Sequence, residues 1–108
     1  MDAPSKLVRG TVDMLVLRAL STARMHGYEV WSWIGEHGGP ALRVEDAALY
    51  QSLRRLEGSG LVSSEWGLSE NNRRARFYSI TGAGRARLRE EVSGWHRYRK
   101  AVQSLLGG

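Results

Sequence analysis

Hydrophobic residues recur with helical spacing between positions 46 and 59. Leu49, Leu53 and Leu56 are separated by four and three positions, so they fall on one face of an α-helix. Asp46 is expected to cap the start of this helix, and the glycines at positions 58 and 60 to end it. The opposite face, small at its start and cationic towards its end, carries Ala47, Gln51, Arg54 and Arg55. This combination is typical of a helix that enters a DNA major groove; a solvated amphipathic helix is the alternative.

The pattern changes from helical to extended after position 60. Residues 61–66 and 76–80 are rich in β-branched and aromatic side chains and predict the two strands of a hairpin. Turn-forming residues lie between them at Gly67, Asn71 and Asn72. Arginines cluster at the tip, at Arg73, Arg74 and Arg76. Such a tip suits contacts to phosphates or to the minor groove, although solubilising charge is the alternative. A helix followed by a basic hairpin is the outline of a winged helix-turn-helix DNA-binding domain.

A first helix is predicted over residues 11–23, with Thr11 as its cap. Its apolar stripe includes Val12, Leu15 and Val16, and much of the remaining surface is apolar as well. A helix that is apolar nearly all round is usually buried on more than one side. It is therefore expected either at the centre of the domain or against a partner subunit.

A second helix is predicted over residues 26–37 and ends at the glycines and proline that follow. The side chains expected to face the core are those of Val30, Trp31, Trp33 and Ile34. Residues 42–44 are expected to form a short strand that pairs with the hairpin. The second and third helices with this intervening segment would form the helix-turn-helix.

The last helix is predicted to begin at a Thr81 cap and to run to about residue 106. Its apolar stripe approaches a heptad repeat and comprises Leu88, Val92, Trp95, Val102 and Leu106. A helix of about 25 residues is about 38 Å long, which exceeds a body of roughly 13 Å radius of gyration. We therefore expect it to form a dimer with a second copy, aided by Val12 and Leu15 of the first helix. The alternative is a helix that folds back on its own domain.

Composition agrees with a polyanionic partner. The 108 residues are expected to form one structural unit, and 16 lysines and arginines against 11 acidic residues give a net charge of +5. This balance favours DNA or an anionic membrane surface as a partner. No apolar run reaches the roughly 20 residues that span a bilayer, and no signal peptide is recognisable at the start, so a cytoplasmic location is expected.

Catalysis and metal binding are not expected. The chain has no cysteine, and its histidines at positions 26, 37 and 96 lie too far apart to suggest a metal site. No phosphate-binding glycine loop, nucleophile elbow or paired carboxylates are present. Four acidic residues fall on outward or flanking positions of the predicted helices and are expected to be solvated: Asp13, Glu29, Glu36 and Glu57.

Several stretches, in order, resemble the PadR family of bacterial transcriptional regulators over about residues 7–106. They are LVRGTVDMLVLRAL, HGYEV at 26–30, ALYQSLRRLEGSGLVSSEW at 48–66, RRARFYSIT followed by AGR, and SGW near the end. One departure is Gln51, at a position where the family commonly has proline. Glutamine can hydrogen-bond a base edge, often that of adenine, which puts the family's operator preference in doubt.

The resemblance extends to the short branch of that family, whose members dimerise through a single C-terminal helix. Some members bind planar hydrophobic drugs between the subunits, with a tryptophan of the last helix stacking on the ligand. Trp95 matches that position, and the residues that could surround a ligand with it are Leu7, Met14, Glu91 and Arg99. The alternative is that Trp95 only packs in the dimer interface.

The expected protein is mainly α-helical with a small β-hairpin wing. Residues 1–80 would form a winged helix-turn-helix domain with an N-terminal arm, and residues 81–108 a dimerisation helix. A homodimer would bind double-stranded DNA at a pseudo-palindromic operator and act as a repressor that a ligand releases. The expected DNA contacts are Ala47, Tyr50, Gln51, Arg54, Arg55, Asn72, Arg73, Arg74 and Arg76. The alternatives are a DNA-binding dimer without an effector and a winged helix that binds an acidic protein or a membrane surface.

Overall fold

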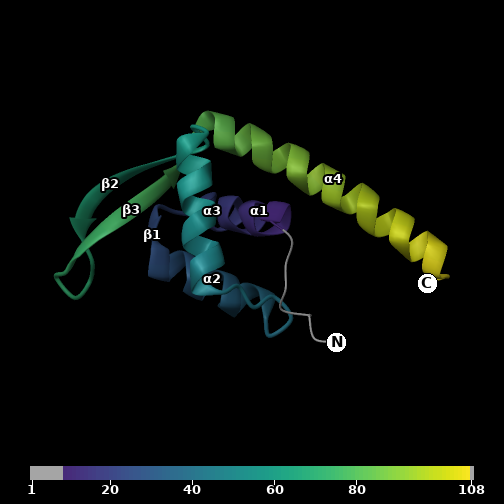
Figure 1. Ribbon diagram of the computed structural model, residues 1–108, viewed down its shortest axis with the longest axis horizontal. Coiled ribbons are helices and arrows are strands. Elements are labelled where there is room, and N and C mark those ends of the chain that lie inside the picture. Colours follow the sequence, from purple (N-terminus) through teal and green to yellow (C-terminus); the bar gives the residue numbers. More distant parts are fainter. Residues whose placement is uncertain (1–8, 108) are drawn as a thin grey trace.

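The structure is a computed structural model that describes residues 9–107. Four helices and three strands follow one another in the order α1 (Arg9–Leu20), β1 (Met25–His26), α2 (Gly27–Gly38), α3 (Asp46–Gly58), β2 (Val62–Leu68), β3 (Arg74–Ile80) and α4 (Gly82–Leu106) (Figure 1). This arrangement confirms the predicted fold class, a mainly helical winged helix-turn-helix with a long last helix. None of the described helices combines the length and the apolar character needed to cross a membrane.

The three strands form one antiparallel sheet in the order β1-β3-β2. β2 and β3 form the wing, with a register that runs from Val62 opposite Ile80 to Leu68 opposite Arg74. The third strand is β1, not the segment 42–44, so the predicted strand was wrong. The Trp31 indole donates a hydrogen bond of 2.9 Å to the Val44 carbonyl oxygen, so this backbone acceptor is bonded to α2 and not to the sheet.

α1 lies at the centre of the core, between α3 and α4 (Figure 1). Val16 and Leu17 are fully buried, and Leu49 and Leu53 of α3 pack in the same cluster. Val12 is only 4% exposed and belongs to this cluster, so it cannot lie in a dimer interface as predicted. The apolar surface on all sides of α1 is therefore explained by its central position within one chain.

Two helix starts differ from the sequence-based prediction. α1 begins at Arg9, so Thr11 lies inside it and is not its cap. α3 begins at Asp46 after Glu45, and no side chain caps it, so the predicted Asp46 cap was wrong. α2 is capped instead by His26, whose Nδ1 accepts from the Glu29 N–H while the Glu29 carboxylate accepts from the His26 N–H. Glu29 is therefore not simply solvated.

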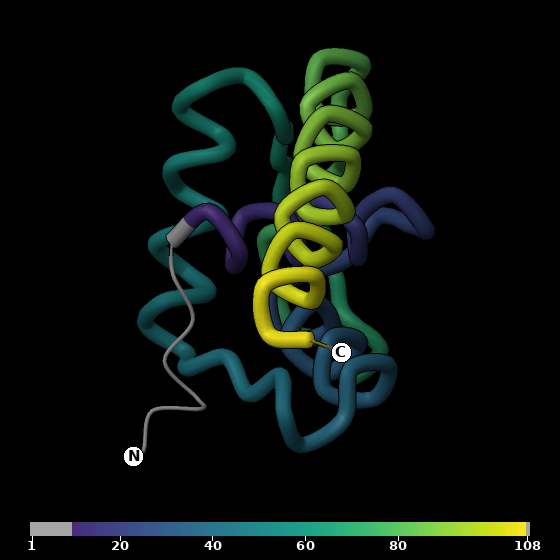
Figure 2. The backbone as a smooth tube through the Cα atoms, turned by 90° about the vertical axis from the view of Figure 1, so that its right-hand side faces the viewer, coloured from purple at the N-terminus to yellow at the C-terminus, as the bar shows by residue number. Residues whose placement is uncertain are grey.

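α4 starts at the predicted cap and leaves the body of the protein. The Thr81 hydroxyl oxygen accepts from the Gly84 N–H at 3.0 Å and lies 2.8 Å from the Gly60 carbonyl oxygen. This junction ties the start of α4 to the turn between α3 and β2. Further along, the helix projects past the other elements, and the longest dimension of the molecule is 52 Å against 30 and 20 Å for the others (Figures 1 and 2).

Candidate nucleic-acid interface

The outer side of α3 and one face of the wing lie next to each other. Tyr50, Arg54 and Glu57 recur at helical spacing on α3 and lie near Tyr78 of β3. Tyr78 alternates with Arg76 and Arg74 on the same face of its strand. Ala47, Gln51 and Arg54 are exposed, so their side chains are accessible to a partner. The structure thus brings most of the predicted DNA contacts to one side of the molecule.

Close packing of α3 against the start of α2 holds the helix-turn-helix together. The Tyr50 ring lies over Gly27, where an added Cβ would come within 2.5 Å of its Cε1 atom. A glycine at this position therefore allows the two helices to approach. Tyr50 remains 44% exposed although its hydroxyl also lies against Gly27, so part of the side chain is still accessible.

Arg55 does not project with Arg54, in contrast to the prediction. Its Nη2 donates a hydrogen bond of 2.7 Å to the Asp13 carboxylate of α1, and Ser52 Oγ donates to the same oxygen at 2.6 Å. The two charged side chains are only 27% and 23% exposed. Asp13 was expected to be solvated and is instead the acceptor of a polar cluster between α1 and α3. Arg55 therefore pairs with α1 in this structure and does not share the exposed side of α3 with Arg54.

Glu57 organises the base of the wing. Its carboxylate accepts from Ser64 Oγ at 2.6 Å and lies 3.4 Å from Nη2 of Arg76, while Nε of Arg76 donates to Ser64 Oγ at 2.9 Å. The expectation that Glu57 is solvated was therefore wrong. This network fixes the position of Arg76 relative to the end of α3.

The wing tip is a short loop, residues 69–73, because both strands are longer than predicted. Asn72 has a φ of 61°, in the left-handed region that asparagine tolerates better than most residues. The Ser69 N–H donates to the Arg73 carbonyl oxygen and the Asn72 N–H to that of Ser69, at 2.8 and 2.9 Å. The tip presents exposed side chains of Asn72, Arg73 and Arg74.

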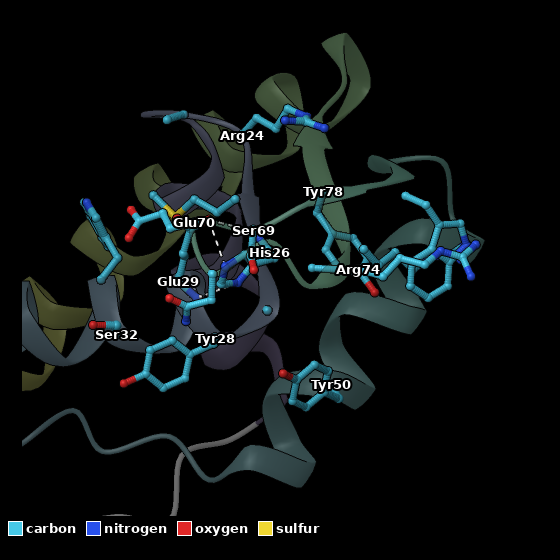
Figure 3. Close-up of a pocket in the computed structure, with 18 of the residues that line it drawn as sticks. Arg24, His26, Tyr28, Glu29, Ser32, Tyr50, Ser69, Glu70, Arg74 and Tyr78 are labelled. Carbon is cyan, nitrogen blue, oxygen red and sulfur yellow. Dashed lines mark hydrogen bonds and ion pairs between the residues drawn. The ribbon is translucent and has the colours of Figure 1, made fainter.

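A cleft of about 880 Å³ separates the wing from α2 and the start of α3 (Figure 3). Tyr28 and Glu29 line it from α2, Tyr50 from α3, and Arg74 and Tyr78 from the wing. Sequence reasoning did not identify this cleft, because it is formed by residues about 50 positions apart that no local pattern connects. It carries both cationic and acidic side chains and opens beside the exposed side of α3.

Burial raises the pKa of Tyr78 above its ordinary value of 10.0, because the phenolate is poorly solvated next to α3. The unfolded chain then loses this proton first as the pH rises past about 10, so the free energy of unfolding falls between that pH and the higher folded-state pKa. We expect Tyr78→Phe to make the alkaline decline less steep. Urea unfolding from about pH 9 to about pH 11 measures this, and superimposable wild-type and variant profiles would contradict it.

The predicted ligand and dimer residues lie on a different side, on α1 and α4. Trp95 is 42% exposed and lies 6.1 Å from Tyr98, ring centre to ring centre. Met14, Glu91 and Val92 are half-buried, whereas Arg99 is exposed and bonds to Gln103. Leu15 and Leu88 pack partly against the core, and Leu7 lies outside the described residues. Within residues 9–107, no three His, Cys, Asp or Glu side chains are grouped as a metal site would require.

The fold and the arginine-rich face define a winged helix-turn-helix protein. Comparison with known proteins identifies the family to which it belongs. The model of the transcriptional regulator PadR-like family matches residues 16–90. The transcriptional regulator Rv3488 of Mycobacterium tuberculosis is 34% identical over 104 residues, which cover 93% of this chain and 87% of that protein. The chain therefore belongs to the PadR-like family of transcriptional regulators, whose members bind DNA and are not enzymes.

Solved structures agree with this assignment. A PadR family transcriptional regulator from Eggerthella lenta has a TM-score of 0.76 and 36% identity, with 91% of this chain and 83% of that chain covered. Bacillus subtilis PadR in complex with operator DNA has a TM-score of 0.68 and 18% identity, with coverage of 76% of this chain and 46% of that chain. At that identity the second likeness supports the fold alone.

Proposed function

We propose that the protein is a homodimeric repressor that binds a pseudo-palindromic DNA operator. The observation that carries this proposal is the common exposure of α3 and the wing arginines on one side of the chain. α3 would enter the major groove, and the wing would hold the adjacent backbone. The contacts assigned to DNA are those of Ala47, Tyr50, Gln51, Arg54, Asn72, Arg73, Arg74 and Arg76.

Within α3, residues in the middle of the helix would contact the DNA bases. Gln51 and Arg54 are exposed, and their amide and guanidinium groups can form paired hydrogen bonds to adenine and guanine edges, respectively. Ala47, one turn earlier, leaves room for the helix to approach the bases. The wing arginines instead supply contacts to phosphates, which position the protein without reading sequence.

The apolar side chains of α4 support a dimer. Trp95 is 42%, Tyr98 63%, Leu105 84% and Leu106 77% exposed on a helix that leaves the body of the protein. Exposed apolar side chains gathered along one element mark an interaction surface. A second copy of α4, packed along Val92, Trp95, Val102 and Leu106, would cover them, and the two α3 helices would then reach successive major grooves about 34 Å apart.

Binding to the region upstream of the protein's own gene tests this function. A gel shift in rising salt should show a preference for that region over random duplex of equal length and composition. Light scattering on the same sample should give twice the mass of one chain. Equal affinity for both duplexes would contradict a sequence-specific regulator, and a monomeric mass would contradict the dimer.

A ligand-controlled form of this function is favoured by the exposure of Trp95. A planar aromatic compound stacked on this indole, between two α4 helices and near Met14, Glu91 and Arg99, would change the spacing of the α3 helices and lower DNA affinity. The Arg99 guanidinium would disfavour cationic compounds.

Tryptophan fluorescence distinguishes a ligand-controlled repressor from one without an effector. We expect planar aromatic compounds to quench the wild-type emission in a saturable way and to weaken the DNA gel shift at the same concentrations. Both effects should be lost in Trp95→Ala. Trp66→Phe serves as a control, because that indole lies on β2 of the wing and not on α4. Quenching that persists in Trp95→Ala would contradict a ligand site at this residue.

A further inference from the structure

An exposed tryptophan on the wing contacts two arginines. Trp66 lies on β2, directly opposite Arg76 in the register of the sheet, and its side chain is 54% exposed. The guanidinium carbon of Arg74 lies 4.6 Å from the centre of the indole ring and that of Arg76 lies 5.5 Å from it. Both distances are within the range of a cation–π interaction.

These three side chains share the face of the wing that lies next to α3. Along β2 this face carries Ser64 and Trp66, and along β3 it carries Arg74, Arg76 and Tyr78. The opposite face carries Phe77 and Glu65, which contact Arg24 instead. Trp66 and the two arginines that contact it therefore lie on the side of the wing that faces α3, where Arg54 is exposed.

Arg76 is held from two directions. Besides the indole it bonds to Ser64, and its Nη2 lies 3.4 Å from the Glu57 carboxylate. Arg74 has only the indole contact among the described interactions. Arg73, at the turn, makes no described side-chain ion pair or aromatic contact. The wing thus contains two arginines whose guanidinium groups have described contacts and one, Arg73, whose side chain has none among the described residues.

A free arginine loses rotamer freedom when it binds a phosphate, which costs part of the affinity. A guanidinium held over the face of an indole has already lost part of that freedom, and its N–H groups remain available to a phosphate. Trp66 lies on β2, an edge strand of the sheet. A large exposed aromatic side chain at such an edge favours association with other chains unless other groups cover it.

We propose that Trp66 is the positioning residue of the wing: its indole holds the guanidinium groups of Arg74 and Arg76 side by side, ready to contact phosphates of the DNA backbone beside the groove that α3 enters. This inference rests on the proposed DNA-binding function and adds a role that does not require Trp66 to touch DNA.

Fluorescence anisotropy with a duplex of the upstream region tests the proposal. Trp66→Leu keeps an apolar side chain on the strand but removes the aromatic face, and we expect roughly tenfold weaker binding to specific and random duplex alike. The dependence of affinity on salt should keep its slope, because both arginines still reach phosphates. Trp66→Phe should retain most of the affinity.

A double-mutant cycle separates positioning from a merely structural role. In an Arg74→Gln, Arg76→Gln background each copy of the proposed dimer loses two phosphate contacts, so the salt slope should fall by about 3.6 for the dimer, and adding Trp66→Leu should then cost nothing more. In the matched Arg73→Gln background, Trp66→Leu should still cost roughly tenfold, because Arg73 does not depend on the indole. If Trp66→Leu weakens DNA binding equally in the wild type, in the Arg74→Gln, Arg76→Gln variant and in the Arg73→Gln variant, the proposal is overturned.

A second variant avoids any change at Trp66. Arg74→Lys with Arg76→Lys keeps both charges but removes both guanidinium groups from the indole, and we expect roughly tenfold weaker binding with an unchanged salt slope. Wild-type affinity in this variant would overturn the positioning role. A wild-type protein that binds no duplex at all would overturn the proposed function as well, so the two failures are distinguishable.

Discussion

Replacing Gly84 by alanine is expected to lower the free energy of unfolding by about 3 kcal/mol. Gly84 is buried in the first turn of α4, and an added Cβ would overlap the Leu61 carbonyl oxygen and come within 2.7 Å of Ile80 Cγ1. The backbone of Leu61 cannot move away freely, because its carbonyl accepts from the Thr81 N–H at 3.1 Å. The added methyl group would therefore disturb the packing of the start of α4 against the turn that follows α3.

Gly82, two residues earlier in the same helix, provides the matched control. An added Cβ there meets no atom within 4 Å. Gly82→Ala should be neutral or stabilising by up to about 1 kcal/mol, because alanine restricts the unfolded chain more than glycine does. Thermal unfolding at one fixed protein concentration compares the two variants. Equal midpoints would show that α4 does not pack on Leu61 as described.

The neighbouring arginines of α3 are expected to have opposite phenotypes. Arg55→Ala removes the cation that pairs with Asp13, which leaves a mostly buried carboxylate with only the Ser52 hydroxyl as a described donor. We expect a loss of about 2–3 kcal/mol in the free energy of unfolding. Once the folded fraction is corrected for, DNA affinity should be close to that of the wild type.

Arg54→Ala should instead leave stability within about 0.5 kcal/mol, because its exposed side chain makes no described ion pair. It should weaken specific DNA binding by about 1–3 kcal/mol and random-duplex binding by less. Urea unfolding measures the stability of both variants, and anisotropy measures their affinities for specific and random duplex. A stable Arg55→Ala variant with weak DNA binding would show that Arg55 leaves Asp13 to contact DNA.

The elements that local patterns determine were predicted well. Leu49, Leu53 and Leu56 are all buried, so their spacing correctly identified the inner face of α3. Thr81 caps α4 because its hydroxyl can reach an N–H three residues on, which is a local contact. The wing strands were found but placed too short, since the charged residues near the tip hide strands that continue to Leu68 and from Arg74.

The errors concern contacts between distant parts of the chain. Arg54 and Arg55 are neighbours of the same residue type, so the sequence does not show which of them is exposed. Arg55 is held against α1 by its bond to Asp13, which lies 42 residues away along the chain. β1 has only two residues, Met25 and His26, too few for a periodic signal. Val12 was assigned to a dimer interface because sequence shows that a residue is apolar but not which element covers it.

The functional residues that sequence missed are those that hold others in place. The sequence indicated a strand and the end of a family motif at Trp66, and a solvated carboxylate at Glu57. Both act through cross-strand or helix-to-strand contacts with Arg76. Gly27 and Gly84 are small because side chains or backbone of other elements occupy the space beside them, which a single sequence does not reveal.

Hydroxyl-radical footprinting of the upstream duplex tests the central claim most directly. If two copies of the chain present α3 and the wing to one operator, two protected blocks related by a two-fold axis should appear about one helical turn, or a multiple of it, apart. Arg54→Ala should weaken both blocks together, whereas Arg55→Ala should leave them in place. A single protected block, or protection no stronger than on random duplex, would contradict a homodimer that reads DNA through α3.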